Sequence, residues 1–190
     1  MCLRLLLVMS VPYVLKRSAR ARTLRLAVYP DASVVVTAPH FFGHGVIERF
    51  VEKHSEWIHR HVRRLEGREV IRIQRGEIAK LKMRALALAS ARCAHFARVY
   101  NVRYKKISVR AQKTRWGSCS RSGSLSFNYK LAVIPPHIAD YIVVHELCHL
   151  SEMNHGKKFW SLVAKSVPQH KAIRAELRRI VVMYEAPSKT

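Results

Sequence analysis

Apolar and polar positions alternate with two different periods along the chain, and the change of period predicts a protein built from strands and helices. Near the start the period is two: Leu24, Leu26 and Val28 alternate with Arg25 and Ala27, as in a half-buried strand. Three strands are expected in this part, over residues 11–15, 23–29 and 33–37, with a turn at 30–32 joining the last two into a hairpin.

Longer segments follow the helical period of 3.6. Residues 41–65 are expected to form one helix whose inner face includes Val46, Phe50, Trp57 and Ile58. A second long helix is expected over 77–100 with Asn101 at its end, a third begins at Pro135-Pro136, and two more cover 158–167 and 169–184. Between the second and third helices, residues 105–111 and 124–131 are expected to form antiparallel strands.

The segment 67–76 contains a glycine at each end and a short extended piece at 70–73, and it is expected to act as a linker. We therefore divide the chain into an N-terminal strand–helix region, residues 1–76, and a core, residues 77–190. A hydrophobic fraction of 49% over 190 residues supplies enough apolar side chains for a packed interior.

Charge changes the picture, because 35 Lys and Arg residues stand against 12 Asp and Glu, a formal net charge of +23. No acidic residue occurs between positions 78 and 139, a stretch that holds 13 Lys and Arg. Such a field attracts polyanions, so nucleic acid or another anionic partner is one interpretation. The other is a solvated basic surface. The cluster formed by Arg17, Arg20, Arg22 and Arg25 likewise has two interpretations, an exposed strand face or a basic docking surface.

The four cysteines are far apart and include no C-x-x-C pair, so neither a disulfide framework nor a four-thiolate zinc site is expected. Reduced thiols favour a cytoplasmic location. The apolar run from Leu3 to Val14 is interrupted by Pro12 and is too short to span a bilayer, although a signal peptide stays open as an alternative.

The sequence His145-Glu146-Leu147-Cys148-His149 places H-E-x-x-H within an apolar run that predicts a buried helix. Residues four apart share one helix face, so His145 and His149 can bind one metal ion, with Glu146 able to reach a metal-bound water. This arrangement is typical of zinc hydrolases. A hydrogen-bonded pair of core histidines is the alternative.

A third ligand is expected from the segment that follows the helix. His155 lies six residues after His149, the spacing of the longer H-E-x-x-H-x-x-G-x-x-H pattern, but Glu152 stands where that pattern has glycine. Asn154 and Gly156 are therefore expected to help turn the chain. Glu152 itself is the alternative third ligand, since carboxylates serve in other zinc sites.

Several motifs occur in a fixed order around this helix, and together they resemble the YgjP-like metal-dependent hydrolases, a bacterial group within the zincin-type metallopeptidases. The matching residues are Arg115-Trp116-Gly117-Ser118-Cys119, Phe127-Asn128, His145-Glu146-Leu147-Cys148-His149, Asn154-His155-Gly156 and Phe159-Trp160. The resemblance implies an α+β, zincin-like core with an antiparallel sheet packed on helices, an active-site helix and an N-terminal β-hairpin extension. It also implies Zn²⁺ held by His145, His149 and His155.

The function expected from these observations is a zinc-dependent metallopeptidase acting on peptide or protein, with Glu146 as general base. Arg115 and Asn128 are candidates for contacts with substrate or transition state. Imidazole ligands also accept other divalent transition metals. Two alternatives remain open: a metal-dependent nucleotide or phosphate-ester hydrolase, which the basic charge favours, and a nucleic-acid-associated module with a structural metal. The sequence leaves the oligomeric state undetermined.

Overall fold

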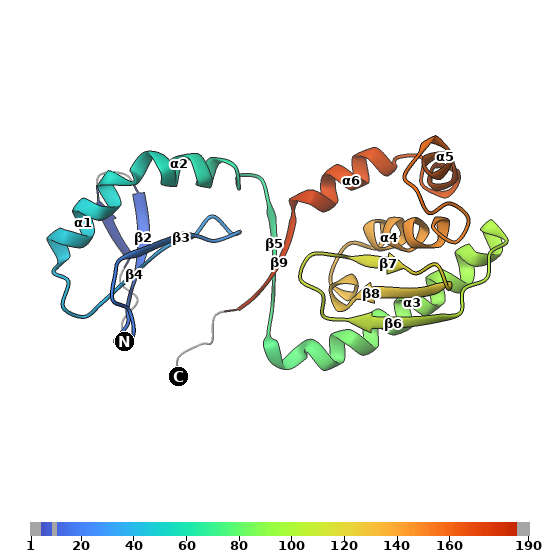
Figure 1. The fold of residues 1–190 in the computed structure, drawn as a ribbon, viewed down its shortest axis with the longest axis horizontal. Helices are drawn as coiled ribbons and strands as arrows, with labels where there is room; N and C mark the ends of the chain where they lie inside the picture. Colours follow the sequence, from blue (N-terminus) through green and yellow to red (C-terminus); the bar gives the residue numbers. More distant parts are fainter. Residues whose placement is uncertain (1–4, 9–10, 186–190) are drawn as a thin grey trace. The chain divides into compact units, whose positions relative to one another are not determined.

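The chain forms two compact units, Met1–Val70 and Ile71–Thr190, in a computed structural model that describes residues 5–8 and 11–185. Figure 1 shows that helices and strands are mixed in both units, so the expected α+β class is confirmed. The boundary falls within β5 (Glu69–Ile73), inside the segment expected to link the two regions.

The first unit contains a four-stranded sheet whose strand order is β1-β2-β4-β3. Its strands are β1 (Leu5–Val8), β2 (Val11–Arg17), β3 (Arg25–Val28) and β4 (Val34–Ala38). The last three lie close to the expected ranges, whereas β1 was not expected. β2 and β4 pair in parallel, while β1 with β2 and β3 with β4 pair antiparallel. The β3–β4 hairpin turns through Ala32, whose φ of 62° lies in the left-handed region that favours glycine.

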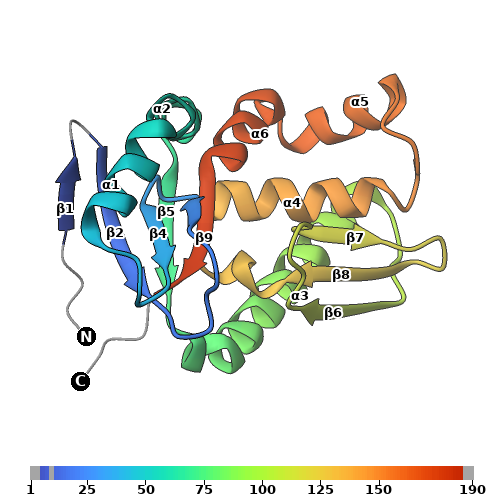
Figure 2. The same cartoon turned by 60° about the vertical axis from the view of Figure 1, so that its left-hand side comes forward.

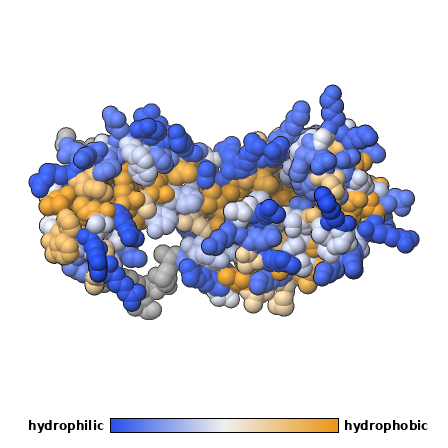
Figure 3. All heavy atoms as spheres, viewed as in Figure 1, coloured by the Kyte–Doolittle hydropathy of each residue, from blue (hydrophilic) through white to orange (hydrophobic). Residues whose placement is uncertain are grey.

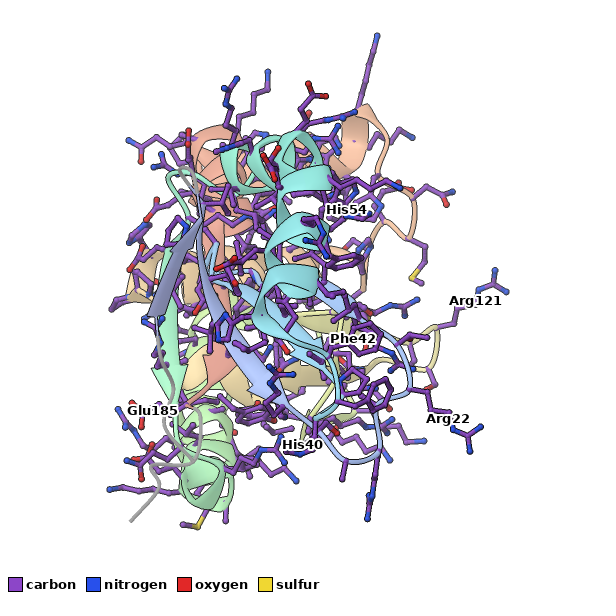
Figure 4. All side chains as sticks on the ribbon, turned by 90° about the vertical axis from the view of Figure 1, so that its left-hand side faces the viewer. Arg22, His40, Phe42, His54, Arg121 and Glu185 are labelled. Carbon is purple, nitrogen blue, oxygen red and sulfur yellow. The ribbon has the colours of Figure 1, made fainter. Side chains whose placement is uncertain are left out.

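The prediction of one helix over residues 41–65 is wrong, because the chain forms α1 (His44–Lys53) and α2 (Ser55–Arg63). The break falls at His54, whose ring Nδ1 lies 2.7 Å from the Phe50 carbonyl oxygen; Figure 4 labels His54 at this junction. The expected inner face was also partly wrong. Ile47, Val51 and Ile58 are buried, whereas Val46 and Trp57 are each 38% exposed.

The reason for the wrong face is that two apolar stripes run side by side on this segment. Val46 and Phe50 each stand one position before Ile47 and Val51, and the second pair faces the core. Branched aliphatic side chains from the helices pack against Tyr13 and Val36 in the core of the first unit.

Arg17, one member of the basic cluster, has a structural contact within the first unit. Its Nη1 donates hydrogen bonds to the carbonyl oxygens of Pro39, at 2.8 Å, and Phe42, at 2.5 Å. Phe42 lies in the connection from β4 to α1 and is labelled in Figure 4. The guanidinium therefore holds this connection to the end of β2.

The second unit begins with β5 and a short 3₁₀ turn (Arg75–Glu77), and then alternates helices with short strands. Its remaining elements are α3 (Ile78–Tyr100), β6 (Lys106–Arg110), β7 (Gly117–Cys119), β8 (Ser124–Asn128), a 3₁₀ turn (Tyr129–Ala132), α4 (Pro136–Cys148), α5 (Lys157–Ser166), α6 (His170–Arg179) and β9 (Ile180–Tyr184). As expected, α3 ends at Asn101, which is left-handed with φ 51°, and α4 begins at Pro136.

The expected antiparallel pairing of residues 105–111 with 124–131 is wrong, because β6 pairs with β8 in parallel. β8 is central, and β7 pairs with its other side in antiparallel register. The sequence reading missed β7, which is only three residues long and contains no apolar alternation. β7 and β8 form a tight hairpin, so they run in opposite directions. The long connection from β6 to β7 crosses to the far side of β8, and β6 therefore runs in the same direction as β8.

The prediction of a helix over residues 169–184 is correct only for its first part. α6 ends at Arg179, and Ile180–Tyr184 forms β9, which pairs with β5. Ile180, Val181 and Val182 are β-branched, so a strand suits their side chains as soon as a partner strand is available. That partner comes from more than a hundred residues earlier in the chain, and local periodicity cannot reveal it.

The core of the second unit lies around α4, which packs against α3, α5, α6 and β7. Figures 1 and 2 show α4 running alongside β7, at one edge of the β6-β8-β7 sheet. Val143, Val144 and Leu147 of α4 are fully buried. None of the helices in the described part of the chain combines the length and hydropathy that a membrane crossing requires.

Candidate metal centre

Three histidine side chains converge where α4 ends and the chain turns back. His145 lies in the last turn of α4, His149 caps it, and His155 follows just before α5. One ligand nitrogen from each ring lies within 4.8 Å of the other two, and Nε2 of His145 is 3.1 Å from Nε2 of His155. The structure thus brings together all three histidines that were expected to bind metal.

Backbone contacts after α4 orient His149. Its Nδ1 lies 3.1 Å from the carbonyl oxygen of Glu152, so an Nδ1–H donor leaves the Nε2 lone pair available to a metal. The Glu152 carboxylate does not belong to the ligand cluster; this residue contributes its backbone instead. Neither Asn154 nor Gly156 takes a left-handed φ, but the Gly156 amide donates a hydrogen bond to the Asn154 carbonyl oxygen at 2.8 Å, so these residues turn the chain without that conformation. The amides of Leu150, Ser151 and Glu152 close the turn by bonding to Leu147 and Cys148 carbonyls.

The environment disfavours the protonated forms of His145 and His155. The pKa of His145 is lowered to about 3, first by burial and then by the neighbouring His149 and His155. The pKa of His155 is also lowered, first by burial and then by His149. A neutral imidazole keeps the lone pair that a metal requires.

The carboxyl group of Glu146 lies beneath β7 and is almost completely buried, with 6% of the residue exposed. Burial raises its pKa to about 8, and the positive charge of Arg115 opposes this shift. A Cβ built on Gly117 would lie 2.7 Å from both Cγ and Oε1 of Glu146. Only a residue without a side chain lets β7 pass this close to the glutamate, a role of Gly117 that the sequence reading missed.

Asn128 and Arg115 are connected through the loop before β7. The Asn128 side chain donates hydrogen bonds to the carbonyl oxygens of Gln112, at 2.7 Å, and Arg115, at 2.9 Å. Both amide hydrogens are therefore used inside the protein, and Asn128, which is 2% exposed, orders the loop. The Arg115 side chain is exposed and carries its charge towards Glu146.

Tyr141 and Arg174 also lie near the histidines, and their spacing in the sequence did not mark them as site residues. The ring of Tyr141, one turn before His145 on α4, has its centroid 5.9 Å from that of His145. Arg174 on α6 lies over Trp160, 5.4 Å from the ring centroid, and its charge lowers the pKa values of His145, His155 and Tyr141. Only the packing of α6 near α4 could have revealed Arg174.

Asp140, early in α4, accepts two hydrogen bonds from Arg92 of α3, at 2.5 and 2.7 Å. The three cysteines described in this unit are free, and burial raises the pKa of Cys119 to about 11. A thiol with that pKa is not a nucleophile at neutral pH.

The donor set fits a divalent transition metal. Three imidazole side chains suit zinc, and no carboxylate of the described residues joins them in the cluster. Nε2 of His145 and Nε2 of His155 face each other at 3.1 Å, and two nitrogen lone pairs at this distance repel each other unless a proton or a cation lies between them. A cation among the ligand nitrogens would replace that repulsion with attraction.

Comparison with known proteins gives a family and two similar structures. The family model “YgjP-like, metallopeptidase domain” matches residues 22–80 and 73–180. The metallopeptidase zymogen of Pyrococcus abyssi abylysin is 22% identical, with TM-score 0.44, over 50% of this chain and 99% of that chain. The zymogen of Methanocaldococcus jannaschii jannalysin is 21% identical, with TM-score 0.43, over 47% and 93%. None of the curated proteins matches.

Proposed function

Since the chain belongs to the YgjP-like metallopeptidase family and is a metal-dependent hydrolase, we propose that it is a zinc peptidase with Glu146 as its general base. His145, His149 and His155 hold the ion. The observation that supports this most directly is the convergence of three imidazole side chains beside one buried carboxyl group. Within residues 5–8 and 11–185, no other group of three or more His, Cys, Asp or Glu side chains has metal-binding spacing.

A zinc ion bound by these histidines supplies Lewis acidity and lowers the pKa of a bound water towards ~7. Glu146 accepts a proton from the attacking water and then passes it to the nitrogen of the leaving amine. The positive charges of Arg115 and of a bound metal ion favour the carboxylate form that accepts the proton, and burial favours its later return to the leaving nitrogen. Gly117 sets the distance between this carboxylate and β7.

Charge that develops on the attacked carbonyl oxygen needs donors besides the metal. Arg115 is the candidate from the sequence, and its exposed guanidinium can reach substrate. Asn128 acts as a positioning residue for Arg115 through the ordered loop. The Tyr141 hydroxyl is a further candidate donor, because burial raises its pKa and keeps its proton in place.

The peptide is proposed to bind as an added strand along β7. This strand forms the edge of the sheet next to α4, and in the described part of the chain it pairs only with β8. Its unpaired amides and carbonyls can bond to an extended peptide backbone. The carbonyl to be attacked would then lie between β7 and the end of α4.

The test is to load the protein with Zn²⁺ and incubate it separately with casein and with nucleoside triphosphates. We expect new peptide amino groups from casein, lost in Glu146→Gln while the variant keeps its zinc. Release of phosphate or pyrophosphate without peptide cleavage would instead establish the phosphate-ester alternative, which the net charge of +23 favours. Salt-sensitive binding of DNA or RNA without turnover of any substrate would establish a nucleic-acid-associated module.

A further inference from the structure

A cavity of about 390 Å³ adjoins the metal centre of the second unit. His149 forms part of its wall, together with Leu150 and Met153 from the segment after α4. The opposite wall comes from the β7–β8 turn, residues 120–123. The volume is large enough for one long side chain, and its contact with a metal ligand places that side chain close to the bond that would be cut.

The polar lining of this cavity is basic. Arg103 and Arg121 both line it, both are exposed, and no Asp or Glu does. Neither guanidinium makes a hydrogen bond or ion pair with any residue of the described ranges. Figure 4 shows Arg121 extending outward from the turn. Figure 3 shows hydrophilic residues over much of the face that it draws, so exposed polar side chains are common on this protein. What distinguishes Arg103 and Arg121 is that both line one cavity.

The turn that carries Arg121 is ordered by its own hydrogen bonds. Ser120 Oγ accepts from the Ser124 amide at 3.0 Å and lies 2.9 Å from Ser122 Oγ. Gly123 is left-handed, with φ 79°, and its carbonyl oxygen accepts a hydrogen bond from the Lys105 amide at 2.7 Å. Hydroxyl groups are therefore held in the wall beside the two guanidiniums, before any ligand is bound.

We propose that this cavity is a specificity pocket for an anionic side chain of the peptide substrate, next to the scissile bond. Arg103 and Arg121 bind the anionic group, Ser122 donates a further hydrogen bond, and Leu150 and Met153 contact the methylene groups. The shared chemistry is that of a carboxylate or a phosphorylated side chain. The proposal rests on the peptidase function proposed above and names its substrate class.

The test uses zinc-loaded protein and matched peptides that differ at one position, where Glu, phosphoserine, Gln or Lys is placed on either side of each bond. We expect KM for the Glu or phosphoserine peptide to be about tenfold or more below that for Gln, since a hydrogen bond to a charged group contributes about this much. Arg103→Gln/Arg121→Gln should abolish the difference. The control double variant Lys80→Gln/Arg84→Gln removes the same charge from exposed positions on α3, and it should keep the KM difference between the Glu and Gln peptides.

Charge reversal gives a second readout. Arg121→Glu is expected to shift the preference from Glu towards Lys at the same position, which a merely structural role of Arg121 would not produce. Cleavage of all peptides with equal KM, or a Glu preference unchanged in the double variant, would overturn the pocket while leaving the peptidase intact. If no peptide is cleaved, binding of the labelled Glu and Gln peptides to the zinc-loaded protein, measured by fluorescence anisotropy, still decides: equal affinity overturns the pocket.

Discussion

Gly117→Ala is expected to disturb catalysis without removing any group that binds metal or substrate. The added Cβ would lie 2.7 Å from Cγ and Oε1 of Glu146, and ordinary contact begins at 3.4 Å, so one of the two must move by about 0.7 Å. Cγ lies close to the α4 backbone and is not the free end of a flexible chain. The strain is therefore shared between the glutamate rotamer and β7.

Two magnitudes follow from this displacement. Overpacking of a close contact costs about 1–3 kcal/mol of stability. A catalytic group misplaced by about 1 Å loses on the order of 100-fold in rate, so a shift of this size should lower kcat by ~10–100-fold. Zinc content should stay the same, because Gly117 contacts Glu146 and none of the three histidines is among its near neighbours.

The assay combines kcat on a cleaved peptide, zinc content by atomic absorption, and urea unfolding of four proteins in a double-mutant cycle. In the Glu146→Ala background the clash is absent, so adding Gly117→Ala should cost little stability. Gly156→Ala is the matched control. Gly156 directly follows the expected ligand His155, but a Cβ at this position would meet nothing within 4 Å. An undiminished kcat in Gly117→Ala, or an equal stability cost in both backgrounds, would refute the reasoning.

Three further outcomes are expected. His155→Ala should lose most of its bound zinc in metal-content measurements whereas Glu152→Ala retains it, because only the backbone of Glu152 contacts the site; equal loss in both would restore Glu152 as a ligand. Burial raises the pKa of Glu146 to about 8 from an ordinary 4.5, so metal-free wild type should lose stability as pH rises from 4.5 to 8, and metal-free Glu146→Gln should not. Urea unfolding measures how the difference in unfolding free energy between these two metal-free proteins changes with pH, and the change should reach at most roughly 4 kcal/mol by pH 8. A difference that stays constant with pH would contradict this prediction. Finally, Ala32→Gly should stabilise the chain by about 1 kcal/mol in thermal unfolding by relieving a left-handed alanine, and Ala27→Gly in β3 should destabilise it.

Short-range patterns predicted the parts of this protein that depend on short-range physics. The helix that carries His145 and His149 was predictable because a continuous apolar run and a proline start leave few other conformations. Its two histidines share a face for the same geometric reason. The end of α3 at Asn101 was predictable because Asn tolerates the left-handed backbone.

Elements that depend on distant partners were not predictable in this way. β9 needs β5, which lies more than a hundred residues earlier, and without it Ile180–Tyr184 continues a helical period. The direction of β6 relative to β8 depends on β7, a strand too short to leave a pattern. The break at His54 and the choice between two apolar stripes on α1 and α2 depended on the surface of the sheet.

The amino-acid sequence by itself determined the ligand types, their spacing on α4 and the excess of positive charge, since these follow from residue identity and helix geometry. Tertiary structure decided how they are used. Packing of β7 against α4 buries Glu146 and raises its pKa, and it makes Gly117 a constraint on the carboxylate. The β7–β8 turn brings Arg121 to the cavity beside His149. Burial and close approach arise only when segments far apart in the chain meet, because a local pattern contains no distances between them.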